Sequence, residues 1–192
     1  MDEIQVINSA YALLGHTRIT SLSDGSEAAV LAGLRFSLVR DAVLEEAPWN
    51  FATIRKALAR SERTPAMDWD YQYPLPTNPY CIKVRDTYPA ENVAWEVGLD
   101  EIDERILMTN QDSIKIRYTA RVVNLNIWSP LAVMALTYLL ASDLALSVTG
   151  QKSKSDQNLE KFAQTLAMAK SSDAREGTPL LARAPITLTG IR

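Results

Sequence analysis

Hydrophobic residues recur at helical spacing near the beginning of the chain. Across residues 2–14 the apolar positions repeat every three or four residues, and Gly15 follows as a stop signal. The pattern predicts a first amphipathic helix, with one face formed by Ile4, Ile7, Tyr11 and Leu14.

A second helix is predicted between residues 24 and 48. Asp24, with Glu27 three residues later, forms a capping signal at its start. Pro48 ends the helix, because a proline disfavours helical geometry in the residue before it. The buried face is predicted to consist of Leu31, Leu34, Leu38 and Ala42.

The second half of the chain predicts two further helices. Ser129 followed by Pro130 is typical of a helix start, and the apolar run that begins there ends at Gly150. Because Ser142 and Asp143 interrupt this run, it predicts a central buried helix rather than a membrane span. A fourth, amphipathic helix is predicted over 156–176, with one face formed by Leu159, Phe162, Leu166 and Ala169.

Between these helices the pattern changes to short alternations separated by prolines. Residues 93–98, 104–110 and 113–122 are predicted strands, and 69–84 is predicted to be extended and rich in turns. Residues 51–60 fit a strand by alternation and a helix by spacing, so both interpretations stay open. The clearest strand face is formed by Ile114, Ile116 and Tyr118.

The order of elements predicts an α+β fold. We expect the N-terminal and C-terminal helix pairs to form a four-helix bundle, because each pair needs a partner to bury its apolar face. Residues 1–48 and 129–176 would form this bundle domain. Residues 49–128 would form a small antiparallel β domain inserted between helices two and three, and 177–192 an extended C-terminal arm.

Composition narrows the functional classes. The chain has 192 residues, 47% hydrophobic and 22% charged, which predicts one globular domain or one domain with an insertion. A net charge of −3 disfavours a dedicated nucleic-acid binder. A single cysteine and a single histidine exclude an internal disulfide and a His/Cys zinc site, so no cofactor or metal is expected. The acidic start does not resemble a secretory signal, and we expect an intracellular product.

Few residues suggest catalysis. His16 lacks a neighbouring nucleophile motif, and Cys81, within an alternating segment, is interpreted as a small buried apolar residue. One acidic run lacks the spacing of a calcium loop and is predicted to be a hairpin turn; it holds Asp100, Glu101, Asp103 and Glu104.

Two functional alternatives remain open. A hydrolase acting on peptidoglycan or polysaccharide would need a pair of carboxylates, for which the candidates are Glu45, Glu46, Asp68 and Asp70. A nucleic-acid binding module would use a basic cluster formed by Arg55, Lys56, Arg60 and Arg63, although a charged outer face is the simpler interpretation.

Aromatic residues next to prolines form a separate feature. Such side chains anchor junctions and interfaces, or else pack in the core, and both interpretations apply here. The candidate anchors are Trp49, Phe51, Trp69, Tyr71 and Tyr73.

Several stretches taken together resemble the tail tubular protein A family, the head-to-tail adaptors of short-tailed phages and their prophage relatives. The resemblance spans roughly residues 10–179 and rests on the order and spacing of four stretches: "EEAPWNFATIRKALAR", "WDYQYPLPTNPYCIKV", "IKIRYTARVVNLNIWSPLAVMALTYLLASDLALSVTG" and "AKSSDAREGTP".

This resemblance implies a structural protein rather than an enzyme. An adaptor of this kind forms a dodecameric ring at the head-tail interface of the virion, after synthesis in the host cytoplasm. Its partners would be the portal protein, a tail nozzle similar to tail tubular protein B, and possible contacts with tail fibres. DNA would pass through the lumen of the ring without specific binding, and no membrane would be involved.

The C-terminal arm is the predicted partner-binding element. It is too irregular to form a helix and too apolar for a solvated tail, so we expect it to become ordered on the portal or on a neighbouring copy. Its candidate contacts are Pro179, Leu180, Leu181, Arg183, Ile186, Leu188, Ile191 and Arg192.

Overall fold

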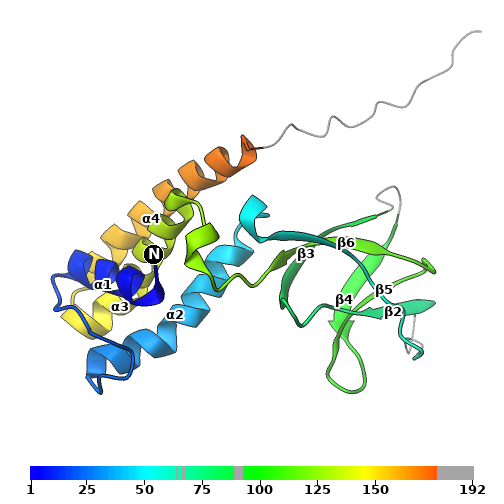
Figure 1. The fold of residues 1–192 in the computed structure, drawn as a ribbon, viewed down its shortest axis with the longest axis horizontal. Helices are drawn as coiled ribbons and strands as arrows, with labels where there is room; N and C mark the ends of the chain where they lie inside the picture. The colour runs from blue at the N-terminus through cyan, green and yellow to red at the C-terminus, as the bar shows by residue number, and fades with distance from the viewer. Residues whose placement is uncertain (64, 66–67, 89–92, 177–192) are drawn as a thin grey trace, which may run out of the picture.

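Helices gather in one part of an elongated molecule and strands in the other (Figure 1). The structure, a computed structural model, describes residues 1–63, 65, 68–88 and 93–176. Within them, the helical part consists of α1 (Glu3–Leu14), α2 (Glu27–Glu45), α3 (Pro130–Thr149) and α4 (Lys152–Ala174), with the 3₁₀ turns η1 (Asn50–Ala52) and η2 (Leu125–Ile127).

Helix α3 lies at the centre of the helical part, as predicted. The Ser129 side chain accepts a hydrogen bond from the backbone of Ala132, Pro130 occupies the first helical position, and Gly150 ends the helix in the left-handed conformation. By length and composition α3 would be able to span a membrane, but 56% of its most apolar window is buried within the protein. The other three helices provide this cover.

The predicted four-helix bundle with an inserted β domain is wrong. The described residues form an α+β molecule with four helices and two small three-stranded antiparallel sheets. Helices α1, α2 and α4 each make their main contacts with α3. Because α3 is apolar on nearly every side, it can cover the apolar faces of three neighbouring helices. The N-terminal helices therefore need not pack as a pair on the C-terminal pair.

Polar contacts fix α1 against its neighbours. A capping box between Asp2 and Gln5 begins the helix. The Tyr11 hydroxyl donates a 2.6 Å hydrogen bond to the Ala28 carbonyl at the start of α2, and burial raises the pKa of this phenol. At the other end, the Lys154 ammonium of α4 donates to the carbonyl of Leu14. These bonds tie α1 to α2 and to α4.

Helix α2 begins and packs differently from the prediction. Its N-cap is Ser26, whereas Asp24 accepts hydrogen bonds from the backbone and hydroxyl of Ser26. The predicted buried face is wrong, because Leu34 and Leu38 are exposed. The side chains that face the core are instead Ala29, Ala32, Phe36, Val39, Val43 and Leu44.

The predicted face of α4 is correct for three of its four residues. Phe162, Leu166 and Ala169 are buried, but Leu159 is 50% exposed and the neighbouring Asn158 is buried in its place. The Asn158 amide donates to the Lys154 carbonyl one turn earlier, which satisfies the buried polar group.

The strands form two antiparallel sheets of three, with the orders β1–β6–β3 and β2–β5–β4. Each predicted segment contributes, and residues 53–57 of the ambiguous segment form a strand after the turn η1. As predicted, Ile114, Ile116 and Tyr118 are buried. The strands are β1 (Thr53–Ala57), β2 (Tyr71–Pro74), β3 (Cys81–Tyr88), β4 (Trp95–Leu99), β5 (Arg105–Thr109) and β6 (Lys115–Ala120).

The acidic run forms the predicted hairpin turn, between β4 and β5. The Asp100 carboxylate accepts hydrogen bonds from the backbone N–H groups of Ile102 and Glu104, and Asp103 adopts a positive φ of 60°. Among the described residues, no group of three or more His, Cys, Asp or Glu side chains is arranged to hold a metal ion.

Polar contacts join the end of α2 to the strands beside it and the end of α4 to the turn η1. The Arg85 guanidinium of β3 donates to the carbonyls of Glu45 and Ala47 at the end of α2, at 2.7 and 2.8 Å, and burial lowers its pKa. The buried Asp173 carboxylate near the end of α4 accepts from the backbone N–H of Asn50. Both contacts satisfy polar groups that would otherwise lack partners at helix ends.

Candidate interaction surface

The outer side of α2 carries a line of large aliphatic side chains. Val30, Leu34 and Leu38 recur every four residues and are 55%, 66% and 62% exposed. This spacing places them on one face, opposite the buried Ala32 and Phe36. We call these three residues the α2 ridge. Aliphatic side chains aligned in this way form a contiguous apolar surface of the kind that binds other proteins.

A second apolar surface is concave and lies between α1 and the first half of α3. It is a groove of about 550 Å³, called here the α1–α3 groove, and it is lined mainly by apolar side chains. Its exposed members, Leu13 and Met134, are 39% and 46% accessible, whereas Trp128 in the lining is buried. Further lining residues are Leu125, Pro130 and Tyr138.

Charges of opposite sign border the two surfaces. Asp24 and Glu27, both exposed, lie at the beginning of α2, next to Val30. Hydrogen bonds from the hydroxyl and backbone of Ser26 lower the pKa of Asp24 to about 2, so this carboxyl is ionised at neutral pH. At the groove, the Lys161 ammonium of α4 lies 5.8 Å from the centre of the Tyr138 ring.

The α2 ridge is held on a rigid support. The Arg35 guanidinium forms a two-pronged ion pair with Asp143 of α3. On the buried side of α2, Ala29 and Ala32 face the core, where α3 contributes small residues such as Ala132 and Ala135. Small side chains allow two helices to approach closely. Leu34 and Leu38 lie on the opposite, exposed side of α2.

Two of the predicted aromatic anchors belong to the core of the helical part. Trp49 is fully buried, and its Nε1 donates a 2.8 Å hydrogen bond to the Val43 carbonyl of α2. Phe51 stacks between Trp49 and Trp128, with ring centres 5.6 and 5.1 Å away. These rings connect the end of α2 to the lining of the α1–α3 groove.

The other three predicted anchors lie in the strand part. Tyr73 is buried, and its hydroxyl donates to the Gln111 carbonyl, while the partly buried Tyr71 packs against the same cluster. Trp69 is partly exposed, with its Nε1 3.4 Å from a carboxylate oxygen of Glu96. Four of the five aromatic residues therefore serve two separate cores, whereas Trp69 belongs to neither.

The carboxylates proposed for a hydrolase are not brought together. Glu45 pairs with Lys83 and Glu46 with Lys170, where α2 ends beside the strands. Asp70 lies immediately before β2, on the far side of the strands from this point, and its backbone N–H donates to Asn110; Asp68 is two residues earlier (Figure 1). The geometry offers no paired-carboxylate site from these residues.

The basic residues proposed for nucleic-acid contact do not form one cluster. Arg63 pairs with Asp100 and Glu104, which offset its charge. The Arg60 guanidinium lies 5.1 Å from the centre of the Tyr71 ring. The remaining two, Arg55 and Lys56, are neighbours on β1, so their side chains point to opposite faces of the strand.

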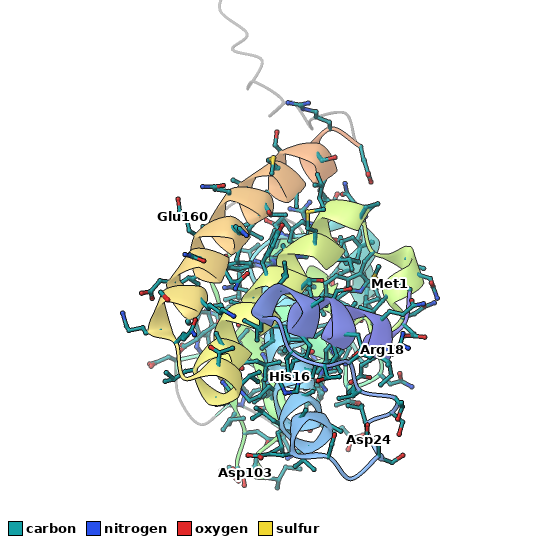
Figure 2. All side chains as sticks on the ribbon, turned by 90° about the vertical axis from the view of Figure 1, so that its left-hand side faces the viewer. Met1, His16, Arg18, Asp24, Asp103 and Glu160 are labelled. Carbon is teal, nitrogen blue, oxygen red and sulfur yellow. The ribbon has the colours of Figure 1, made fainter. Side chains whose placement is uncertain are left out.

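His16 and Cys81 occupy unrelated positions. His16 is exposed after α1, where its Nδ1 lies 2.9 Å from the Thr17 carbonyl (Figure 2). Cys81 is fully buried in β3, as predicted, and burial raises the pKa of its thiol to about 11. A thiol with such a pKa is protonated at neutral pH and is a poor nucleophile.

The predicted partner-binding residues of the arm lie outside the described residues; they are Pro179, Leu180, Leu181, Arg183, Ile186, Leu188, Ile191 and Arg192. The α2 ridge was missed because its leucines were assigned to the core. The available signal was a second apolar stripe on α2, formed by Ala29, Ala32, Phe36 and Val39. A helix with two apolar stripes can bury only one of them on its own core.

No protein-family model matches the chain, and no curated protein matches it.

Proposed function

We propose that this chain is a structural subunit of a ring, the head-to-tail adaptor of a short-tailed phage. The ring would join the portal protein to the tail nozzle and continue the DNA channel. The proposal follows from the resemblance of four stretches to the tail tubular protein A family. The observation that carries it is the α2 ridge, an apolar line on the side of the helix that faces away from its own core.

The energetics of the ridge favour a protein partner. Burying a valine or leucine side chain stabilises a protein by about 1.5–3 kcal/mol. The ridge leaves three such side chains more than half exposed, although its own helix offers Ala29 and Ala32 to the core instead. Packing against a neighbouring subunit would recover this free energy, and closed rings provide every subunit with such a neighbour.

The division of the molecule also supports the proposal. Helices fill one part and strands the other, so a subunit that packs through its helices leaves its sheets free to project (Figure 1). On the sheets, Lys115 and Arg117 are opposed by Asp86 and Tyr88 of the neighbouring strand. Such a polar face is compatible with solvent or with a polar contact to another tail component.

The direct test is the mass of the purified chain, measured alone and after mixing with portal protein from the same phage. We expect the mixture to contain a portal-bound dodecameric ring. Persistence of separate chain and portal species at all mixing ratios would contradict the proposal.

The arm can be tested in the same measurement. Helix α4 ends at Ala174, so deletion of residues 178–192 leaves all four helices in place. We expect the shortened chain to stay folded, by its circular dichroism, and to lose attachment to the portal. Undiminished attachment would remove the arm from the proposed interface without affecting the proposed ring.

A further inference from the structure

We infer that neighbouring copies of this chain pack head to tail, with the α2 ridge of one copy inserted in the α1–α3 groove of the next. This inference rests on the proposed ring and deepens it, because it names the two surfaces that meet. In this arrangement, Val30, Leu34 and Leu38 of one copy would occupy the groove beside Leu13 and Met134 of another copy.

The two surfaces match in shape and polarity. The ridge is convex and apolar, since its side chains project from the outer side of a straight run of helix. The groove is concave, and its volume of about 550 Å³ is lined mainly by apolar side chains from α1, η2 and α3. An aliphatic ridge seated in such a groove is the arrangement by which an amphipathic helix binds a partner protein.

Their charges also match. The beginning of the ridge is acidic, with Asp24 and Glu27 exposed beside Val30. At the edge of the groove, the exposed Lys161 ammonium of α4 lies 5.8 Å from the centre of the Tyr138 ring, which lines the groove. Opposite charges at the border of an apolar contact fix its orientation and disfavour the reversed one. This complementarity selects a second copy of the chain as the occupant.

The positions of the two surfaces define the symmetry. The ridge lies on α2, whereas α1, η2 and α3 line the groove, so the two surfaces are different patches of one chain. Two different patches that meet between copies give a head-to-tail contact, which produces a closed ring when the rotation closes.

Cross-linking of the full chain tests this pairing. The double variant Leu34→Cys with Met134→Cys carries one thiol in the ridge and one in the groove. Both side chains are about half exposed or more, so the changes leave the core intact. The native Cys81 is buried and does not compete. Treatment with a short bis-maleimide should give a ladder of covalent oligomers on a denaturing gel.

The controls separate this pairing from other contacts. The control variant is Ile102→Cys with Met134→Cys, in which the first cysteine lies in the strand part instead of the ridge. Ile102 and Leu34 are both apolar and both 66% exposed. We expect about tenfold less cross-linked product from this pair, because only a specific interface raises the local thiol concentration. Each single variant should remain uncrosslinked.

The outcomes are distinct. A ladder from the ridge and groove pair alone supports the inference. Dimers from Leu34→Cys by itself would show ridge against ridge and overturn it, as would equal products from test and control pairs. If a portal-bound ring forms but the ladder does not, the inference fails and the proposed function stands. If the ladder forms without portal attachment, the proposed function fails and the pairing stands.

Discussion

The helical part and the strand part differ in what they expose. On the helices, exposed apolar side chains form connected surfaces, namely the α2 ridge and the α1–α3 groove. On the strands, the exposed apolar residues are separated: Leu99 and Ile102 flank one hairpin turn, and Tyr88 lies beside Lys115. The sheets otherwise present ion pairs such as Arg117 with Asp86. The comparison supports the proposal that the helices, rather than the sheets, contact neighbouring protein chains.

The same two parts have separate hydrophobic cores. The helical core contains α3 and the rings of Trp49 and Trp128, whereas the strand core is centred on Tyr73, Leu107 and Tyr118. Ile82 of β3 packs against the helical core, and polar contacts such as those of Arg85 also join the two parts.

The largest effect is expected in the helical core. Leu136 of α3 is fully buried, so Leu136→Ala removes side-chain contacts and leaves a cavity. We expect the free energy of unfolding in urea to fall by about 2–5 kcal/mol. The matched variant is Leu34→Ala on the ridge, which should change stability by less than about 0.5 kcal/mol. Equal losses in the two variants would show that the ridge belongs to the core.

An intermediate effect is expected where the two parts meet. Arg85→Ala removes the donor shared by the Glu45 and Ala47 carbonyls, and it also removes a hydrogen bond to Thr119. We expect a loss of about 1–3 kcal/mol in the same urea titration, because partly buried carbonyls are left without a donor. Arg55→Ala, at an exposed position of β1 in the same sheet, serves as the control. A loss in Arg85→Ala no larger than in this control would contradict the role of Arg85 as the link.

The smallest effect concerns the pH dependence of Asp173. Burial raises the pKa of this carboxyl above its ordinary value of 3.8, so the folded state holds the proton more tightly than the unfolded state. The contribution of Asp173 to the free energy of unfolding is therefore greatest below pH 3.8, and it is lost as the pH rises through the folded-state pKa. In Asp173→Asn this loss is absent.

Urea titrations of both proteins between pH 3.5 and 7, in steps of about half a unit, check this prediction. The stability of Asp173→Asn relative to the original chain should improve as the pH rises. A constant difference, or one that worsens with pH, would show that Asp173 is not held in the environment that raises its pKa.

The sequence predicted elements better than their packing. Local signals such as Ser129, Pro130 and Gly150 located α3, because caps depend on a few neighbouring residues. The pairing of β1 with β6 and of β2 with β5 was not predicted, since these partners are far apart along the chain and alternation does not identify them. The bundle failed for the same reason, because periodicity shows that a helix has an apolar face but not which helix covers it.

The candidate surface shows this limit most clearly. Leu34 and Leu38 have helical spacing and high hydrophobicity, so they were assigned to the core. The structure buries Ala32 and Phe36, on the opposite side of α2, instead. Periodicity alone cannot distinguish a stripe that faces the chain's own core from one that faces another chain. The apparent error in the buried face is thus the feature that supports the proposed interface.

The central claim is that the apolar surface of the helices joins copies of the chain. Sedimentation velocity of the original chain, Leu34→Glu and Ile102→Glu, each at concentrations on the order of 100 µM, tests it most directly. Leu34 and Ile102 are equally exposed, at 66%, so each variant places one negative charge at a position with the same solvent exposure. We expect the original chain and Ile102→Glu to associate into larger species, while Leu34→Glu sediments as a monomer. Association of Leu34→Glu equal to that of Ile102→Glu, or a monomeric original chain, would contradict it.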